Sequence, residues 1–139
     1  MNPRAVQLRE RTKAFASAVI KYCEKLPNVV AARRITEQLI DSAGSAYSNY
    51  RATCRARSPD EFIAKIGLAA EESDESQGWL ELLVETNLAT HEASCDLIKE
   101  ADELTAIFVA SRITAQRRKE EKERQRKEEQ AAKRLGRRK

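Results

Sequence analysis

The sequence is poor in the residues that build sheets and tight turns. Only 5% of its 139 residues are aromatic, and it has 4 glycines and 3 prolines. A protein of many strands needs more aromatic residues within its strands and more glycine and proline between them. Hydrophobic residues make up 41% of the chain and charged residues 35%, a balance typical of amphipathic helices with solvated outer faces. The composition predicts an all-α protein with one core.

Long hydrophobic runs are also missing. No stretch approaches the roughly 18 uncharged apolar residues that a membrane-spanning helix requires. The first residues, Met1-Asn2-Pro3-Arg4, do not open an apolar secretory leader. We therefore expect a cytoplasmic protein with no membrane partner.

The sequence has little to offer a metal or a catalytic centre. It contains one histidine, His91, and three cysteines, Cys23, Cys54 and Cys95, on separate segments. An odd number of cysteines without a CxxC or HxxxH pair predicts free thiols that act as small hydrophobes. Glycine-rich phosphate loops and nucleophile–histidine pairs are absent as well. We expect no enzyme, no metal and no cofactor.

The alternative is a metal site formed by one acidic cluster. Glu71, Glu72, Asp74 and Glu75 lie within five positions, and carboxylates four residues apart share a helix face. Helical di-iron sites also need a Glu-x-x-His element, which His91 does not provide. We therefore interpret the cluster as a solvated face, or as an interface that meets basic residues.

Four segments carry apolar residues at alternating spacings of three and four. These heptad seams run from Leu8 to Leu26, from Ile35 to Thr53, from Phe62 to Leu83 and from Leu97 to Ser111. Short loops between such segments make neighbouring helices antiparallel. The spacing predicts an antiparallel up-down-up-down four-helix bundle over residues 1–111. Residues 112–139 form a charged C-terminal extension, either helical or disordered.

Start and stop signals separate the four segments. Pro27-Asn28 ends the first helix. Ser58, Pro59 and Glu61 suit a capping box, in which the serine caps the helix and the glutamate returns to the backbone. Thr90 is the expected N-cap of the fourth helix.

Small residues occupy the middle of the second and third seams. Around Ser42, Gly44 and Ala46, and again around Ser76, they would let the two helices approach closely. Asn49 falls on the second seam, so we expect it to be buried and hydrogen-bonded. Tyr50 and Trp79 lie beside their seams. We expect them to face a partner, with the alternative that Trp79 completes a wide core stripe.

Charge alternates along the chain in three blocks. Residues 1–57 carry 11 basic and 4 acidic residues, residues 58–111 carry 2 and 13, and residues 112–139 carry 13 and 5. The first and last blocks therefore favour acidic or phosphate partners. The candidate contact residues are the arginines at the end of the second helix and the cations of the tail: Arg51, Arg55, Arg57, Arg117, Arg118, Lys119, Lys133, Arg134, Arg137, Arg138 and Lys139.

Each group of cations has a structural alternative. The arginines near residue 55 also suit the negative end of the helix dipole. Interleaved glutamates in the tail permit helix-stabilising salt bridges. The tail has no aromatic residue, so base stacking is not expected there.

Several short motifs resemble one known family. They are Gln38-Leu39-x-x-Ser42-Ala43-x-Ser45, Asn49-Tyr50-Arg51-Ala52, Ala56-Arg57-Ser58-x-x-Glu61-Phe62-Ile63-Ala64-Lys65-Ile66, Glu71-Glu72-x-Asp74-Glu75-Ser76, Trp79-Leu80-Glu81-Leu82-Leu83 and Glu100-Ala101-Asp102-Glu103-Leu104. The pattern, over about residues 5–115, resembles the four-helix-bundle proteins encoded in intervening sequences of bacterial 23S ribosomal RNA genes. A related branch is the accessory variability determinant of diversity-generating retroelements, which binds a reverse transcriptase.

The resemblance implies a homo-oligomer, in the form of a pentameric ring. Together with the basic residues, it predicts a non-enzymatic helical scaffold that binds RNA or a nucleic-acid-processing partner. The alternative is a protein–protein interaction scaffold without nucleic-acid contact, in which the acidic third segment docks a basic partner.

Overall fold

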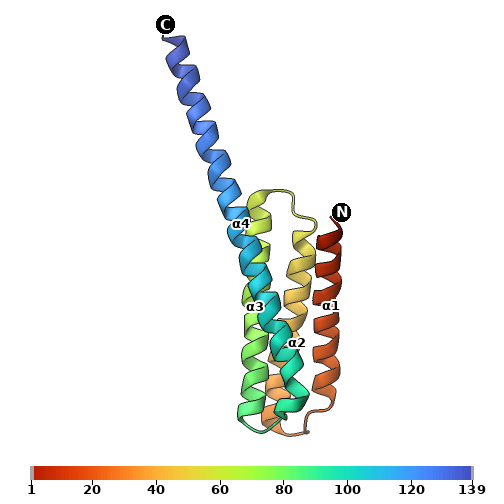
Figure 1. Ribbon diagram of the computed structural model, residues 1–139. Helices are drawn as coiled ribbons and strands as arrows, with labels where there is room; N and C mark the ends of the chain where they lie inside the picture. The colour runs from red at the N-terminus through yellow and green to blue at the C-terminus, as the bar shows by residue number, and fades with distance from the viewer. Residues whose placement is uncertain (1, 139) are drawn as a thin grey trace.

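The computed structural model describes residues 2–138 and consists of four helices joined by short turns. They are α1 (Pro3–Glu24), α2 (Val30–Thr53), α3 (Pro59–Glu85) and α4 (His91–Arg137). The fold is 88% helical, and the described residues form no strand. Figure 1 shows α1 to α4 running alternately down and up, with α4 continuing past the bundle. The predicted all-α bundle is confirmed.

Side chains cap three of the helices at their N-termini. The Asn2 side chain accepts a hydrogen bond from the Arg4 amide, Ser58 Oγ from the Glu61 amide, and Thr90 Oγ1 from the Ala93 amide. These bonds satisfy amides that have no partner inside the helix. The returning half of the predicted capping box differs, because the Glu61 carboxylate accepts from the Arg57 amide, at 3.4 Å, and not from Ser58.

The four seams meet along the bundle axis. The fully buried side chains include Val19 of α1, Leu39 of α2, Ile66, Leu80 and Leu83 of α3, and Leu104 and Phe108 of α4. Cys23 is buried, Cys54 and Cys95 are half-buried, and all three are free thiols as predicted.

The small central layer joins α2 and α3 closely, as the sequence predicts. Ser42 and Ser76 are buried, and their Oγ atoms lie 2.8 Å apart in a hydrogen bond across the two helices. Each Oγ also lies within hydrogen-bonding distance of a carbonyl oxygen one turn earlier, that of Leu39 for Ser42 and that of Glu72 for Ser76. Because a hydroxyl has one hydrogen, one serine donates to the other, which in turn donates to its own carbonyl. Gly44 is not part of this contact, because a Cβ built there would meet no atom within 4 Å.

The end of α2 turns a different side chain inward from the one predicted. Tyr50 is buried and stacks on Phe108 with ring centroids 5.2 Å apart, whereas Asn49 is half-buried and donates to Ser45. The predicted burial of Asn49 and the predicted exposure of Tyr50 to a partner are therefore wrong, whereas the predicted hydrogen bonding of Asn49 is confirmed. A straight helix drifts by about 20° per heptad from a strict seven-residue repeat, so the neighbouring position enters the core after two heptads.

Trp79 packs against the core as a half-buried side chain. Its Nε1 is buried and has no hydrogen-bond partner among the described residues. The ring thus widens the apolar stripe of α3, which is the alternative considered for it from the sequence.

The C-terminal extension is helical and belongs to α4. The helix has 47 residues, about 70 Å at 1.5 Å per residue. Its last fully buried side chain is Phe108, and residues 124–138 are exposed. The tail therefore projects as a free-standing helix from the end of the bundle where α2 meets α3 (Figure 1).

Candidate nucleic-acid interface

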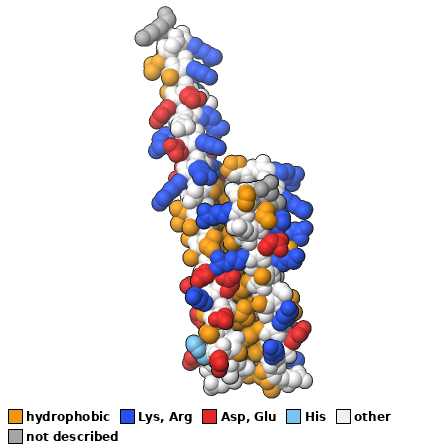
Figure 2. Space-filling model, turned by 45° about the vertical axis from the view of Figure 1, so that its right-hand side comes forward, with side chains coloured by type: hydrophobic (Ala, Val, Ile, Leu, Met, Phe, Trp, Pro, Cys, Tyr) orange, Lys and Arg blue, Asp and Glu red, His pale blue; other side chains and the backbone are white. Residues whose placement is uncertain are grey.

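Three parts of the chain come together at the end of the bundle from which the tail rises. We call this the bundle end: the first residues of α1, and residues 51–60, which close α2 and open α3. Arg4, Arg51, Arg55 and Arg57 are all exposed there. Figure 2 shows Lys and Arg side chains gathered at this end and along the tail. The fold thus brings the basic N-terminal block next to the basic tail.

Local contacts leave most of this charge facing solvent. Arg51 Nη1 donates to Tyr47 Oη at 3.3 Å, one turn earlier on α2. Arg57 Nε lies 3.9 Å from a Glu61 oxygen, but the Arg57 side chain is 91% exposed. An exposed pair at this distance contributes little to stability. Arg51, Arg55 and Arg57 therefore remain available to an anionic ligand, and they also sit at the negative end of α2.

Lys119 differs from the other predicted tail residues because it is held by the bundle. Its Nζ lies 2.6 Å from Asp60 Oδ1 at the start of α3. This hydrogen bond and the charge of Asp60 raise the pKa of Lys119 above its ordinary value. Among the described tail residues, no other ion pair forms, so the salt bridges that the interleaved glutamates permit are not seen there. Lys119 therefore links α4 to the start of α3.

The remaining tail cations are exposed. Arg117 and Arg118 lie just beyond the bundle, and Lys133, Arg134, Arg137 and Arg138 lie further along the free helix. Arg118 also lines a shallow hollow with Arg4 and Phe62, between α1 and α4. Lys139 lies outside the described residues.

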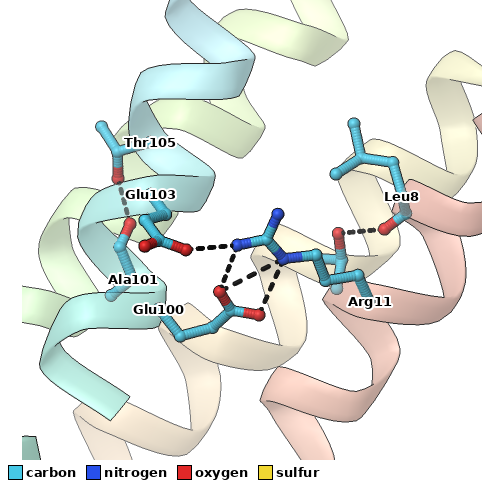
Figure 3. Close-up of polar contacts among 7 residues, drawn as sticks. Leu8, Arg11, Glu100, Ala101, Glu103 and Thr105 are labelled. Atoms are coloured by element: carbon cyan, nitrogen blue, oxygen red, sulfur yellow. Dashed lines mark hydrogen bonds and ion pairs between the residues drawn. The ribbon is translucent and has the colours of Figure 1, made fainter. Parts of the chain in front are cut away.

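A contact that the sequence did not reveal joins α1 to α4. Arg11 donates to both carboxylate oxygens of Glu100 through Nε, at 3.2 and 2.9 Å, and to Glu103 through Nη2 at 2.7 Å (Figure 3). The two carboxylates raise the pKa of the Arg11 guanidinium. Glu100 and Glu103 are three positions apart, and residues at this spacing on a helix share a face. This spacing is the one sign in the sequence that a cation could bridge the two carboxylates.

The Arg11 contact matters because α1 and α4 pack less extensively than the other neighbouring helices. Tyr22 Oη and Ser94 Oγ, 2.7 Å apart, form a second link between them. Figure 2 shows apolar side chains exposed along the length of the bundle. Shallow hollows line this seam, bordered by residues such as Phe15 and Leu97.

The acidic cluster of α3 lies away from the bundle end. Glu71, Asp74 and Glu75 are exposed, and Glu72 is half-buried. Burial raises the pKa of Glu72, with a further contribution from the neighbouring Glu75 and Glu71 carboxylates. Within residues 2–138, no three His, Cys, Asp or Glu side chains are placed to hold a metal ion.

No helix within residues 2–138 combines the length and the apolar character needed to cross a membrane.

Comparisons with known proteins place this geometry in a family. A solved structure of a protein of unknown function from the S23 ribosomal protein family of Bacteroides thetaiotaomicron is similar to this chain. It has a TM-score of 0.70 and 24% sequence identity, over 78% of this chain and 96% of that one. No curated protein matches the chain. The pattern of the family described as 23S rRNA-intervening sequence protein matches residues 4–110. The chain therefore belongs to the family of 23S rRNA-intervening sequence proteins.

Proposed function

We propose that this protein is a non-enzymatic, cytoplasmic, homo-oligomeric scaffold that binds RNA through the basic residues of its bundle end and tail. The main support is that exposed cations from the basic block of residues 1–57 and from the basic tail meet at one end of the molecule. Residues 112–139 have 13 basic and 5 acidic residues, and Arg51, Arg55 and Arg57 stand beside them. Clustered lysines and arginines attract phosphate by releasing counterions, whatever the base sequence.

Assembly would strengthen that attraction. Each tail alone offers a weak, unspecific contact, and several tails on one particle raise the local concentration of cations. The loosely packed α1–α4 seam and exposed apolar side chains such as Val30, at 64%, support contacts between copies. The family's description also links it to RNA.

The acidic face of α3 supports a second candidate function. Glu71, Asp74 and Glu75 are exposed on one helix, and charge of one sign on an interface favours a partner of the other sign. In that case the protein is a protein–protein scaffold and its tail only solubilises it.

RNA binding measured against salt separates the two functions. We expect a labelled RNA to bind the full chain at about 50 mM NaCl and to be released steeply as salt rises, since several phosphate contacts are lost together. Absence of binding at this low salt would favour the protein–protein scaffold.

A charge-matched pair of variants localises the binding. The triple variant Arg51→Gln, Arg55→Gln and Arg57→Gln should weaken RNA binding several-fold. The control triple variant, Lys21→Gln, Lys25→Gln and Arg34→Gln, removes the same charge from exposed positions at the opposite end of the bundle. Equal weakening by the two triples would show that only net charge matters and that the bundle end is not the site.

A further inference from the structure

The face of α4 that is buried in the bundle becomes a row of cations beyond it. Arg112, Lys119, Arg126 and Lys133 recur every seven residues along one uninterrupted helix. Residues seven apart lie on the same side, with a drift of about 20° per heptad. This side continues the one that carries the buried Leu104 and Phe108 in the bundle.

Two contacts fix the direction in which this side points. The Arg112 Cδ lies 3.6 Å from where a Cβ on Gly67 would be, so Arg112 covers α3. One heptad later, Lys119 is bound to Asp60 at the start of α3. The next cations on this side, Lys122, Arg126, Lys133 and Arg137, lie beyond the first residue of α3 and are exposed. We call these four residues the inner face of the tail.

The inner face overlooks the bundle end. The chain turns through Arg55 and Arg57 immediately before Asp60, the residue that holds Lys119. Figure 1 shows the tail rising at an angle from this turn. The cations of the inner face and the arginines of the bundle end therefore both border the angle between the tail and the bundle.

Acidic residues dilute the other sides of the tail more than this one. Helical geometry places Glu120, Glu121 and Glu128 on the side opposite the inner face, while Glu123 and Glu129 border it. Three outer cations, Arg117, Arg124 and Lys127, each have a carboxylate four residues away. On the inner face Lys133 has one as well, Glu129, whereas the other three cations have none.

Lys122, on the inner face, has a cation four residues before it, Arg118, and another four residues after it, Arg126. Positive potential is therefore concentrated on the inner face.

We propose that the inner face and the bundle-end arginines form one surface that binds the phosphate backbone of double-helical RNA. The proposal rests on the proposed function and names its ligand. From Lys122 to Arg137 the row spans about 22 Å on a straight helix, which suits a stiff backbone. Double-helical RNA is recognised through its shape and its backbone. The tail lacks the aromatic residues on which single-stranded bases stack.

Two variants of equal charge test this surface. The inner variant carries Lys122→Gln and Arg126→Gln, and the outer variant carries Arg124→Gln and Lys127→Gln. All four positions are exposed and helical and lie at the same level of the tail, so circular dichroism should be unchanged in both. Affinity for a labelled RNA duplex, of about 20 base pairs, is measured by fluorescence anisotropy between about 50 and 200 mM NaCl. A second duplex of unrelated sequence and a single strand are measured in parallel.

We expect the inner variant to bind both duplexes about tenfold more weakly, with a salt slope lower by about two. The outer variant should stay within about threefold of the unchanged protein. Equal losses in the two variants, or a single strand that binds as tightly as the duplex, would overturn the inference while leaving RNA binding intact. Failure of the unchanged protein to bind any RNA at low salt would overturn the proposed function itself.

Discussion

Single residues set the distance between α2 and α3. Ser42 and Ser76 are buried at the centre of the bundle and hydrogen-bond each other at 2.8 Å. Ala46 and Ala69 are also fully buried on these two helices. Side chains this small leave no room for extra carbon atoms, and well-packed cores resist added volume.

We expect Ser76→Leu to lower the free energy of unfolding by about 1–3 kcal/mol through overpacking. Ala46→Leu should act in the same direction, because Ala46 is fully buried. Ser48→Leu is the matched control, since Ser48 is exposed on α2. Urea unfolding followed by circular dichroism measures all three variants. Unchanged stability in both core variants would show that the central layer is not close-packed.

Arg11 acts at the same scale between α1 and α4. It bridges two carboxylates on α4, where few other polar contacts hold the helices together. Its side chain is 37% exposed, so solvent weakens the attraction, and such pairs contribute about 1 kcal/mol or less. The contact fixes the orientation of α1 more than it stabilises the fold.

At the scale of the helix, α4 serves two purposes with one continuous element. Its first half buries Ala101, Leu104 and Phe108 in the core. Its second half keeps helix-forming residues but exchanges apolar side chains for charged ones. A helix without an apolar stripe has little surface to bury and does not pack.

A chain that ends at Arg124 should unfold at the same temperature as the full protein, because residues 125–138 are exposed and helical only by their own propensity. RNA binding should weaken, since the end of the basic row is removed.

A chain that ends at Gln116 additionally loses the Lys119–Asp60 contact, and its unfolding temperature should fall slightly. Lys119→Gln in the full chain is the control and should show the same small fall, which salt diminishes. A large loss of stability on cutting at Arg124 would mean that the distal tail packs against the protein.

At the scale of the whole molecule, charge and apolar surface are unevenly shared. The bundle end and tail are basic, the middle of α3 is acidic, and Val30, Ile20 and Leu68 are exposed at 64%, 46% and 41%. Scattered apolar residues are ordinary on a surface. We expect these exposed side chains and the sparsely packed α1–α4 seam to provide surface for contacts between copies.

Light scattering coupled to size exclusion should therefore give a mass several times 15.7 kDa. Opposite charges on different copies favour assembly, and the family resemblance implies a ring. The mass should be measured at two salt concentrations, because screening weakens contacts between charges. A strict monomer at micromolar concentration would contradict the ring and remove the contribution of multivalency to RNA binding.

The sequence alone predicted much of the fold but only part of the candidate site. Heptad seams, Pro27, the Ser58 cap and the Thr90 cap are local signals, and each lies where the structure has a helix or its boundary. The cations were also readable from the sequence. Their grouping was not, because Arg55 and the tail are brought together by the turn between α2 and α3 and by the length of α4.

By itself the sequence determined that the chain is helical, where the caps of α3 and α4 lie, and that small residues occupy the middle of α2 and α3. These features depend on periodicity and capping, which act over a few residues. Only the tertiary structure decided that Tyr50 enters the core in place of Asn49, and that Lys119 pairs with Asp60. These outcomes depend on how each helix is rotated against its neighbours, and small deviations from a seven-residue repeat accumulate along a straight helix until they change which side chain faces inward.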